Sequence, residues 1–215
     1  PGDDFGPLFS PDGERLYFTR GEGQGRYTIL SRPLGSGDEV AILAADVIQG
    51  PVAVSPHGRL LVVVQFPKGK GELFVLDLSH PGEPKAITAT PDFSESRASF
   101  SPDGRWLAFQ SDESGRPEIY VQPFPGPGRK WQVSTAGGTF PIWGPRGGEL
   151  LYRSADQQLT RVEVAAGASF DAGVPEPLFA LPLAAGNSLR KIAITPDGER
   201  FLALVPAGAN AAAPV

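Results

Sequence analysis

A four-residue motif that recurs along the chain restricts the possible folds more than any other feature of the sequence. Its copies begin at residues 10, 55, 101, 144 and 195, so the successive spacings are 45, 46, 43 and 51 residues. Copies at such regular spacing indicate a repeat architecture in which each repeat is one structural unit. The copies are Ser10-Pro11-Asp12-Gly13, Ser55-Pro56-His57-Gly58, Ser101-Pro102-Asp103-Gly104, the degenerate Gly144-Pro145-Arg146-Gly147, and Thr195-Pro196-Asp197-Gly198.

The motif has the chemistry of a tight turn. Proline presets φ at the second position, Asp or His suits the third, and Gly tolerates a left-handed conformation at the fourth. A Ser or Thr hydroxyl at the first position can bond back to the turn backbone. Because short apolar stretches flank every copy, each predicts two antiparallel strands around a turn. The expected pairs are 7–9 with 16–18, 52–54 with 60–64, 98–100 with 106–109, 141–143 with 150–152, and 192–194 with 201–205.

Two further strands follow in each complete repeat. Polar, Gly-rich links lead from the second strand of a repeat to the third. Four short antiparallel strands in about 45 residues are typical of one β-propeller blade. A helical repeat of this length is excluded, because the apolar residues do not recur with a 3.6-residue period. The expected third strands are 27–31, 72–78, 118–124 and 159–164, and the expected fourth strands are 40–43, 85–90, 131–135 and 177–181.

The sequence therefore predicts an all-β fold, a β-propeller region of four-stranded antiparallel blades that spans residues 1–215. A half blade leaves an open sheet edge, which proteins usually pair or cover. We therefore expect the chain to be a fragment of a larger closed ring. The expected blades are about 4–46, 47–91, 95–136 and 138–182, followed by a partial blade at 189–205.

Composition and charge exclude several classes of function. The chain holds 27 Gly and 23 Pro, but 40% of its residues are hydrophobic, which suits many tight turns around a core. A net charge of −5 lacks the basic field that drives nucleic-acid binding. Without cysteine there is no disulfide or thiolate chemistry. No apolar run reaches the length of a membrane span, so we expect this segment itself to make no membrane contact.

Residues 100–126 and 131–154 closely resemble the repeats of TolB-like bacterial propellers. More narrowly, they resemble the C-terminal propeller of bacterial membrane-anchored serine/threonine protein kinases. In that kinase family a cytoplasmic kinase domain and a membrane helix precede the propeller. The chain carries no Gly-rich loop with a strand lysine, no HRD and no DFG triplet. The resemblance therefore implies an extracytoplasmic sensing or scaffolding part, with kinase activity left to another part of the parent protein.

Candidate chemistry along the chain is sparse. His57 replaces the usual Asp of the turn motif, and His80 lies in a second turn sequence, so we interpret both as solvated turn residues. Residues 21–25 superficially resemble a phosphate loop but open no helix. Lys68-Gly69-Lys70 resembles the end of a Walker motif, but Val64 occupies the required upstream Gly position and no Ser or Thr follows. The acidic pairs 3–4 and 112–113 lack the spacing of a calcium loop. We predict no catalytic residue, no metal and no cofactor.

Binding candidates come from the geometry of a propeller, whose innermost strands begin near the mouth of the ring. By alignment of the repeats these residues are Asp4, Gln49, Arg97, Arg190 and Lys191, with a polar channel lining as the alternative. Aromatic residues beside the turns are expected to pack between blades, whereas Trp131 is expected to be partly exposed. The aromatic residues expected to pack between blades are Phe9, Phe18, Phe100, Trp106, Phe109, Trp143 and Tyr152.

We predict a non-catalytic module that binds a protein, a peptide or a small ligand on one face of the ring. The kinase resemblance implies the extracytoplasmic or periplasmic side of a bacterial membrane, with a cytoplasmic location kept open. Two alternatives remain. A gating propeller of a prolyl-oligopeptidase-like serine peptidase requires a hydrolase domain downstream. A periplasmic TolB-like translocation partner requires a signal peptide upstream.

Overall fold

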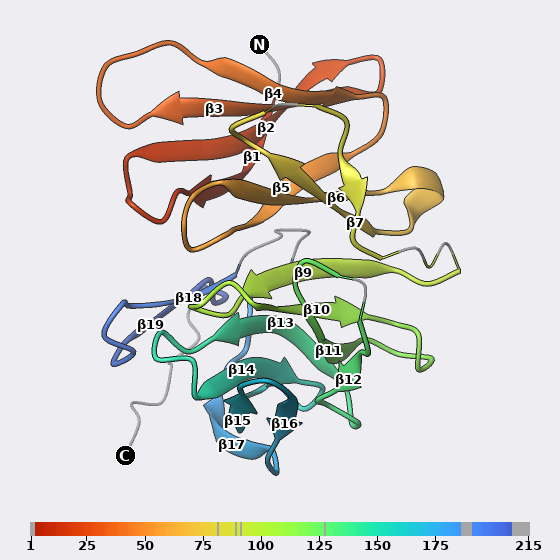
Figure 1. Ribbon diagram of the computed structural model, residues 1–215, viewed down its shortest axis with the longest axis vertical. Coiled ribbons are helices and arrows are strands. Elements are labelled where there is room, and N and C mark those ends of the chain that lie inside the picture. Colours follow the sequence, from red (N-terminus) through yellow and green to blue (C-terminus); the bar gives the residue numbers. More distant parts are fainter. Residues whose placement is uncertain are drawn as a thin grey trace. The chain divides into compact units, whose positions relative to one another are not determined.

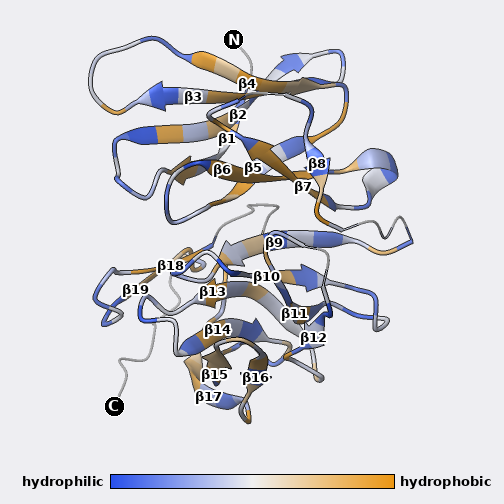
Figure 2. Cartoon of the chain, in the orientation of Figure 1, coloured by the Kyte–Doolittle hydropathy of each residue, from blue (hydrophilic) through white to orange (hydrophobic). Residues whose placement is uncertain are grey.

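The computed structural model describes residues 3–80, 82–88, 90, 92–126, 128–185 and 191–207 (Figure 1). Within these ranges the regular structure consists of β-strands and one 3-10 turn, Pro67–Gly69. The chain divides into two compact units, Pro1–Ser96 and Arg97–Val215. Figure 2 shows hydrophobic residues along the centres of the strands and mostly hydrophilic residues in the links. This distribution is expected where sheets bury their faces against one another.

The first unit begins with a four-stranded sheet in which strands that follow each other in sequence are antiparallel neighbours. Its strands are β1 (Asp4–Phe9), β2 (Arg15–Gly23), β3 (Arg26–Pro33) and β4 (Val40–Ala45). The Gly-rich link that superficially resembled a phosphate loop is the end of the β2–β3 hairpin.

The second sheet of this unit repeats the same order. It consists of β5 (Gln49–Val54), β6 (Leu60–Gln65), β7 (Glu72–Asp77) and the short β8 (Lys85–Ala86). The two sheets share a hydrophobic core to which each contributes alternate residues of its strands. Its buried members are Leu8, Tyr17 and Ile29 from the first sheet and Leu61, Val63 and Leu76 from the second.

A third sheet follows the same plan. It contains β9 (Glu95–Phe100), β10 (Trp106–Ser111), β11 (Glu118–Pro123) and β12 (Trp131–Gln132). Both β8 and β12 are shorter than predicted. Only two residues of β8 pair with β7, and only two residues of β12 pair with β11.

The fourth sheet departs from the pattern at its last strands. β13 (Gly138–Trp143), β14 (Glu149–Ser154) and β15 (Gln158–Ala166) pair in order. The long β15 then pairs with two strands, β17 (Glu176–Ala180) along its first half and β16 (Phe170–Ala172) along its end. The sequence does not predict β16, because three residues are too few for an alternating pattern to indicate a strand.

A two-stranded sheet of β18 (Ile192–Ile194) and β19 (Phe201–Ala203) completes the described strands. In the second unit the fourth sheet packs against the third sheet on one face and against the β18–β19 sheet on the other. Leu150 and Tyr152 belong to the core shared with β10 and β11, whereas Leu151 belongs to the core shared with β18. Because side chains alternate along a strand, one short strand serves two cores.

The turn motif folds as its chemistry predicts. In the five copies the amide of the last Gly donates to the carbonyl of the first residue at 2.8–3.0 Å. The five glycines have φ between 71° and 79°. The hydroxyl of Ser101 accepts the amide of Trp106 at 3.0 Å and donates to Asp103 at 2.6 Å. These bonds close the hairpin within the motif. The strands on the two sides of each copy pair with each other, as the sequence predicts.

The aromatic residues beside the turns are buried as predicted, with one exception. Phe18, Phe100, Trp106, Phe109, Trp143 and Tyr152 are buried, and Trp131 is half-buried as expected. Phe9 was predicted to pack between blades, but its side chain is 57% exposed. The prediction is wrong at this residue because in β1 the alternation places Leu8 in the core.

Candidate functional site

The fourth residue before each turn motif occupies an equivalent place in successive blades. These residues are Gly6, Pro51, Arg97, Phe140 and Lys191. The strand pairing is interrupted beside this place in β1, β5 and β13. Gly6, Arg97 and Phe140 have positive φ values of 65°, 52° and 56°. The first strand of a blade therefore bulges at this place, and a bulge redirects the side chain that it carries.

In the second unit three of these side chains come together. The guanidinium carbon of Arg97 lies 4.4 Å from the centre of the Phe140 ring, and Nζ of Lys191 lies 5.8 Å from the same point. A cation near an aromatic face gains a favourable interaction with the ring electrons. Arg97 also donates to Gln110 at 3.4 Å, and Lys191 donates to the carbonyl of Ala184 at 2.6 Å.

A third cation, that of Arg153, lies near Lys191. Arg153 of β14 pairs with Thr139, the residue before Phe140, and its Nε donates to the carbonyl of Leu181 at 3.1 Å. Its charge is close enough to Lys191 to act on the pKa of that amine. We refer to Arg97, Phe140, Arg153 and Lys191 as the basic cluster.

Burial sets the electrostatics of the basic cluster. Lys191 is only 9% exposed, and Arg97 and Arg153 are half-buried. Burial lowers the pKa of Arg97 and that of Arg153. Burial also lowers the pKa of Lys191, and repulsion from Arg97 and Arg153 adds to the effect. The fold thus holds positive charges close together in a poorly solvated place, where an anionic group would interact favourably with all of them.

The backbone at Arg97 and Phe140 is strained. Holding a residue other than glycine at positive φ raises its conformational energy by about 1 kcal/mol or more, and glycine avoids most of this cost. In β1 the equivalent residue is a glycine, Gly6, with φ 65°. Such strain is concentrated at functional sites in proteins. The presence of Arg and Phe at these positions, where glycine would be less strained, therefore supports a role for their side chains.

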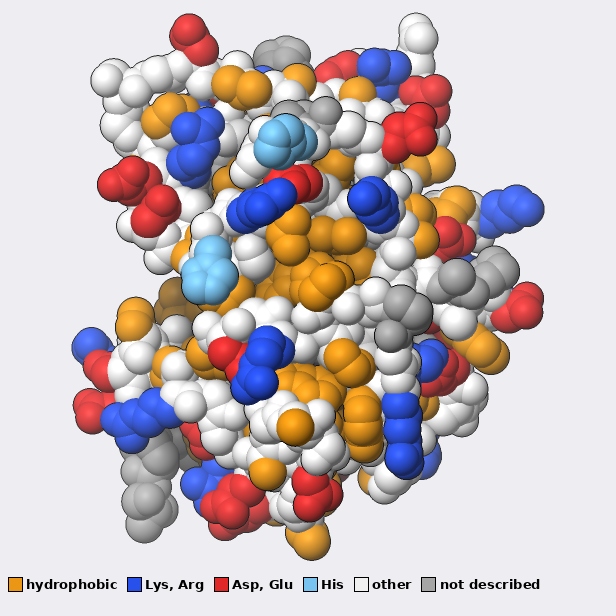
Figure 3. Space-filling model, viewed as in Figure 1, with side chains coloured by type: hydrophobic (Ala, Val, Ile, Leu, Met, Phe, Trp, Pro, Cys, Tyr) orange, Lys and Arg blue, Asp and Glu red, His pale blue; other side chains and the backbone are white. Residues whose placement is uncertain are grey.

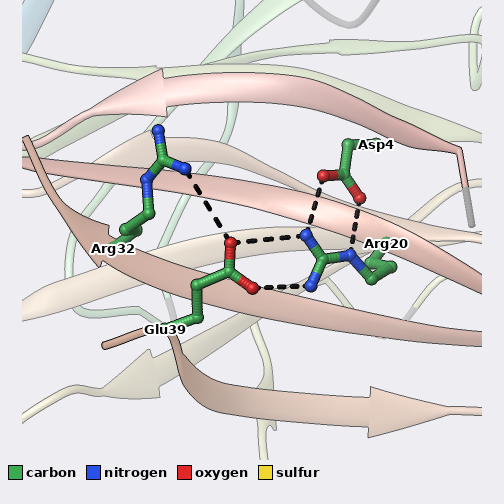
Figure 4. Close-up of polar contacts among 4 residues, drawn as sticks. All are labelled: Asp4, Arg20, Arg32 and Glu39. Carbon is green, nitrogen blue, oxygen red and sulfur yellow. Dashed lines mark hydrogen bonds and ion pairs between the residues drawn. The ribbon is translucent and has the colours of Figure 1, made fainter. Parts of the chain in front are cut away.

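Asp4 belongs to an ion-pair network on the first unit (Figure 4). Its two carboxylate oxygens each accept a hydrogen bond from Arg20 at 2.8 Å. Arg20 also pairs with Glu39 at 2.6 Å, and Arg32 lies 4.0 Å from the other oxygen of Glu39. The hydrogen bonds from Arg20 lower the pKa of the Asp4 carboxyl. Asp4 is exposed, but its charge is engaged by Arg20.

Gln49 has no exposed surface. Its amide nitrogen donates to the carbonyls of Tyr27 at 2.9 Å and Leu43 at 3.2 Å, and its oxygen accepts from Gln65 at 3.1 Å. This side chain therefore joins the two sheets of the first unit. Glu95, which occupies the same place before its own turn motif, is also fully buried and accepts a hydrogen bond from the Thr90 hydroxyl.

Of the five residues proposed from the sequence, the structure brings Arg97 and Lys191 together. Asp4 and Gln49 lie in the first unit in separate surroundings, and Arg190 lies outside the described residues. Sequence reasoning missed Phe140 and Arg153. Counting four residues back from the degenerate turn copy finds Phe140. Arg153 comes from a second strand, and no repeat signal marks it.

The remaining candidates are in solvated places. His57 and His80 are exposed turn residues. Among the described residues no group of three His, Cys, Asp or Glu side chains is placed to hold a metal ion. On the face drawn in Figure 3, acidic and basic side chains are interspersed. The described ranges contain no helix that is long and apolar enough to cross a membrane.

Comparison with solved structures places this architecture among known folds. The chain matches TolB from Acinetobacter baumannii with a TM-score of 0.74 and 20% identity, over 96% of this chain and 50% of that protein. A protein of Agrobacterium tumefaciens assigned as TolB matches with a TM-score of 0.66 and 18% identity, over 91% of this chain and 71% of that protein. A puromycin-hydrolyzing peptidase of Mycobacterium tuberculosis matches with a TM-score of 0.61 and 13% identity, over 90% of this chain and 32% of that protein.

At these identities the likeness shows the fold, which TolB shares with a peptidase, and leaves function to the site. The chain spans half the length of the Acinetobacter protein. No curated protein matches its sequence. The family model of the TolB beta propeller domain matches residues 3–172. Together with the four-stranded antiparallel sheets, this match confirms the predicted propeller fold: the chain belongs to the TolB beta propeller domain family.

Proposed function

We propose that this chain is a non-catalytic binding module that recognises a protein or peptide partner. The observation that carries the proposal is the basic cluster, in which equivalent places of successive blades present Arg97, Phe140 and Lys191 to one another. Buried charges on a rigid, strained frame suit recognition of a partner. Both histidines, His57 and His80, are exposed residues of turns, where solvated imidazoles are usual, which also favours a binding role over a catalytic one.

We further propose that the module is the extracytoplasmic part of a bacterial serine/threonine kinase. The support is the resemblance of residues 100–154 to the propellers of such kinases, together with membership of the TolB-like family. The complete reading frame tests this context. A kinase domain followed by one hydrophobic helix upstream is the expected result, and a signal peptide in their place would contradict it. A hydrolase domain downstream would favour a gating propeller, an alternative suggested by the fold-level likeness to a peptidase.

The non-catalytic part of the proposal predicts that the purified chain does not turn over generic ester and peptide substrates. The comparison is with a His57→Gln, His80→Gln double variant and with buffer alone. We expect the same background rate in all three. Turnover above background that persists in the double variant would reveal a catalytic site elsewhere in the chain and would overturn the proposal.

A further inference from the structure

We propose that the basic cluster binds an oxyanion of the ligand, either a carboxylate or a phosphate group, beside the ring of Phe140. The inference rests on the proposed binding function and names the chemistry that this function recognises. Three observations lead to it: the hydrogen-bond donors that the cluster offers, the proximity of its charges, and the absence of a structural need for cations at this place.

The first observation is the bonding of Arg153. Its Nε is engaged by the carbonyl of Leu181. No side chain or carbonyl within the described ranges accepts a hydrogen bond from its two terminal amino groups, and neither group is among the buried polar atoms that lack a partner. The planar fork of a guanidinium matches the two oxygens of a carboxylate or phosphate. Arg153 is therefore oriented by one bond and retains donors for an oxyanion.

The second observation is the proximity of charges. The guanidinium of Arg97 and the amine of Lys191 lie 4.4 and 5.8 Å from the centre of one ring, that of Phe140. Repulsion from Arg97 and Arg153 contributes to the lowered pKa of Lys191, after burial. A negative group placed among these cations would relieve the repulsion and regain part of the lost solvation.

The third observation comes from the other blades. The same place in the first unit holds Gly6 and Pro51, which carry no charge, although the strands bulge there in the same way. A blade therefore forms without a cation at this place. At Arg97 the side chain is kept despite a left-handed φ of 52°, which glycine adopts with less strain. This cost favours a binding role for the Arg97 side chain in addition to its contacts with Phe140 and Gln110.

Isothermal titration of the 215-residue chain tests the inference. The probes are acetyl-Glu-Glu-Glu-Glu-amide, the matched acetyl-Gln-Gln-Gln-Gln-amide, and inorganic phosphate. We expect the Glu peptide to bind at least about tenfold more tightly than the Gln peptide, because charged hydrogen bonds are lost in the latter. We also expect its affinity to fall as salt is raised. Phosphate binding in place of the Glu peptide would identify the second source of the same oxyanion chemistry.

Variants locate the binding site. Arg153→Gln and Lys191→Gln should each weaken binding of the preferred oxyanion by about tenfold or more. Lys191→Arg should retain binding because it retains the positive charge. Arg146→Gln is the matched control, since Arg146 is an exposed arginine in a turn of the same sheet and lies outside the cluster. Its binding should equal that of the wild type. Circular dichroism must show the wild-type spectrum for each variant used.

Several results would overturn the inference: no binding of either anion, equal binding of the Glu and Gln peptides, or losses as large for Arg146→Gln as for the cluster variants. If Arg153→Gln fails to fold, Lys191→Gln with its Lys191→Arg counterpart decides the question. These failures concern anionic ligands only, so they do not overturn the binding of an uncharged protein or peptide partner. Detection of substrate turnover would instead remove the proposed function while leaving oxyanion binding measurable.

Discussion

Replacing Phe100 with alanine should lower the free energy of unfolding by about 3–5 kcal/mol, whereas Phe9→Ala should lower it by less than about 1 kcal/mol. Both phenylalanines directly precede a copy of the turn motif. Phe100 is 8% exposed and its ring meets that of Phe124 edge-on at 4.9 Å, while Phe9 is 57% exposed. The same substitution at the same place in the repeat thus separates the effect of burial from that of sequence position.

Urea unfolding measures this difference. All three tryptophans, Trp106, Trp131 and Trp143, lie in the second unit with Phe100, so their fluorescence reports its unfolding. Far-UV circular dichroism follows both variants. We expect a large shift of the midpoint for Phe100→Ala and little shift for Phe9→Ala. Equal losses for the two variants would show that the sheets do not pack as described.

A second large effect is expected at Gly71, where a methyl group has no room. A Cβ added to Gly71 would lie 2.3 Å from the backbone oxygen of Glu95, and the backbone there cannot give way as a flexible side chain would. The amide of Glu95 also donates to the carbonyl of Gly71 at 2.7 Å. Gly71→Ala should therefore push the backbone at residue 71 away from that at Glu95 and lower the free energy of unfolding by about 1–3 kcal/mol or more.

Gly35→Ala is the control for this substitution. Gly35 lies in the same unit, has no heavy atom within 4 Å of the added Cβ, and does not adopt a positive φ. It should leave stability unchanged or raise it by less than about 1 kcal/mol, because alanine restricts the unfolded chain. Thermal unfolding of both variants measures the contrast. A Gly71→Ala protein as stable as Gly35→Ala would contradict the close approach of Gly71 and Glu95.

The parts of the fold that the sequence predicts are those governed by local chemistry. Ser101, Pro102, Asp103 and Gly104 make their own hydrogen bonds, so the motif specifies a turn and the two strands beside it without help from distant residues. The fourth strands depend on pairing at an edge, which local patterns describe poorly. This is why 85–90 and 131–135 were predicted where only Lys85–Ala86 and Trp131–Gln132 are formed.

The candidate site shows the same division. Arg97 and Lys191 follow from their polar character at the start of a first strand. Phe140 was overlooked because an aromatic residue in a strand suggests core packing, although its place in the repeat is the same. Arg153 depends on the register of β14 against β13, in which it lies opposite Thr139. Register between strands is a tertiary property, and the sequence carries no local signal for it.

The titration of Lys191 tests the central claim most directly, namely that the propeller frame holds the cations of Arg97, Arg153 and Lys191 close together. Lysine side chains labelled with ¹³C are followed by NMR as pH is raised, and the signal absent from Lys191→Arg identifies Lys191. Burial and the nearby Arg97 and Arg153 should hold its pKa below the ordinary lysine value, and Arg153→Gln should raise it by removing one of the repelling charges. A Lys191 pKa at or above the ordinary value of about 10.4, unchanged in Arg153→Gln, would contradict the claim.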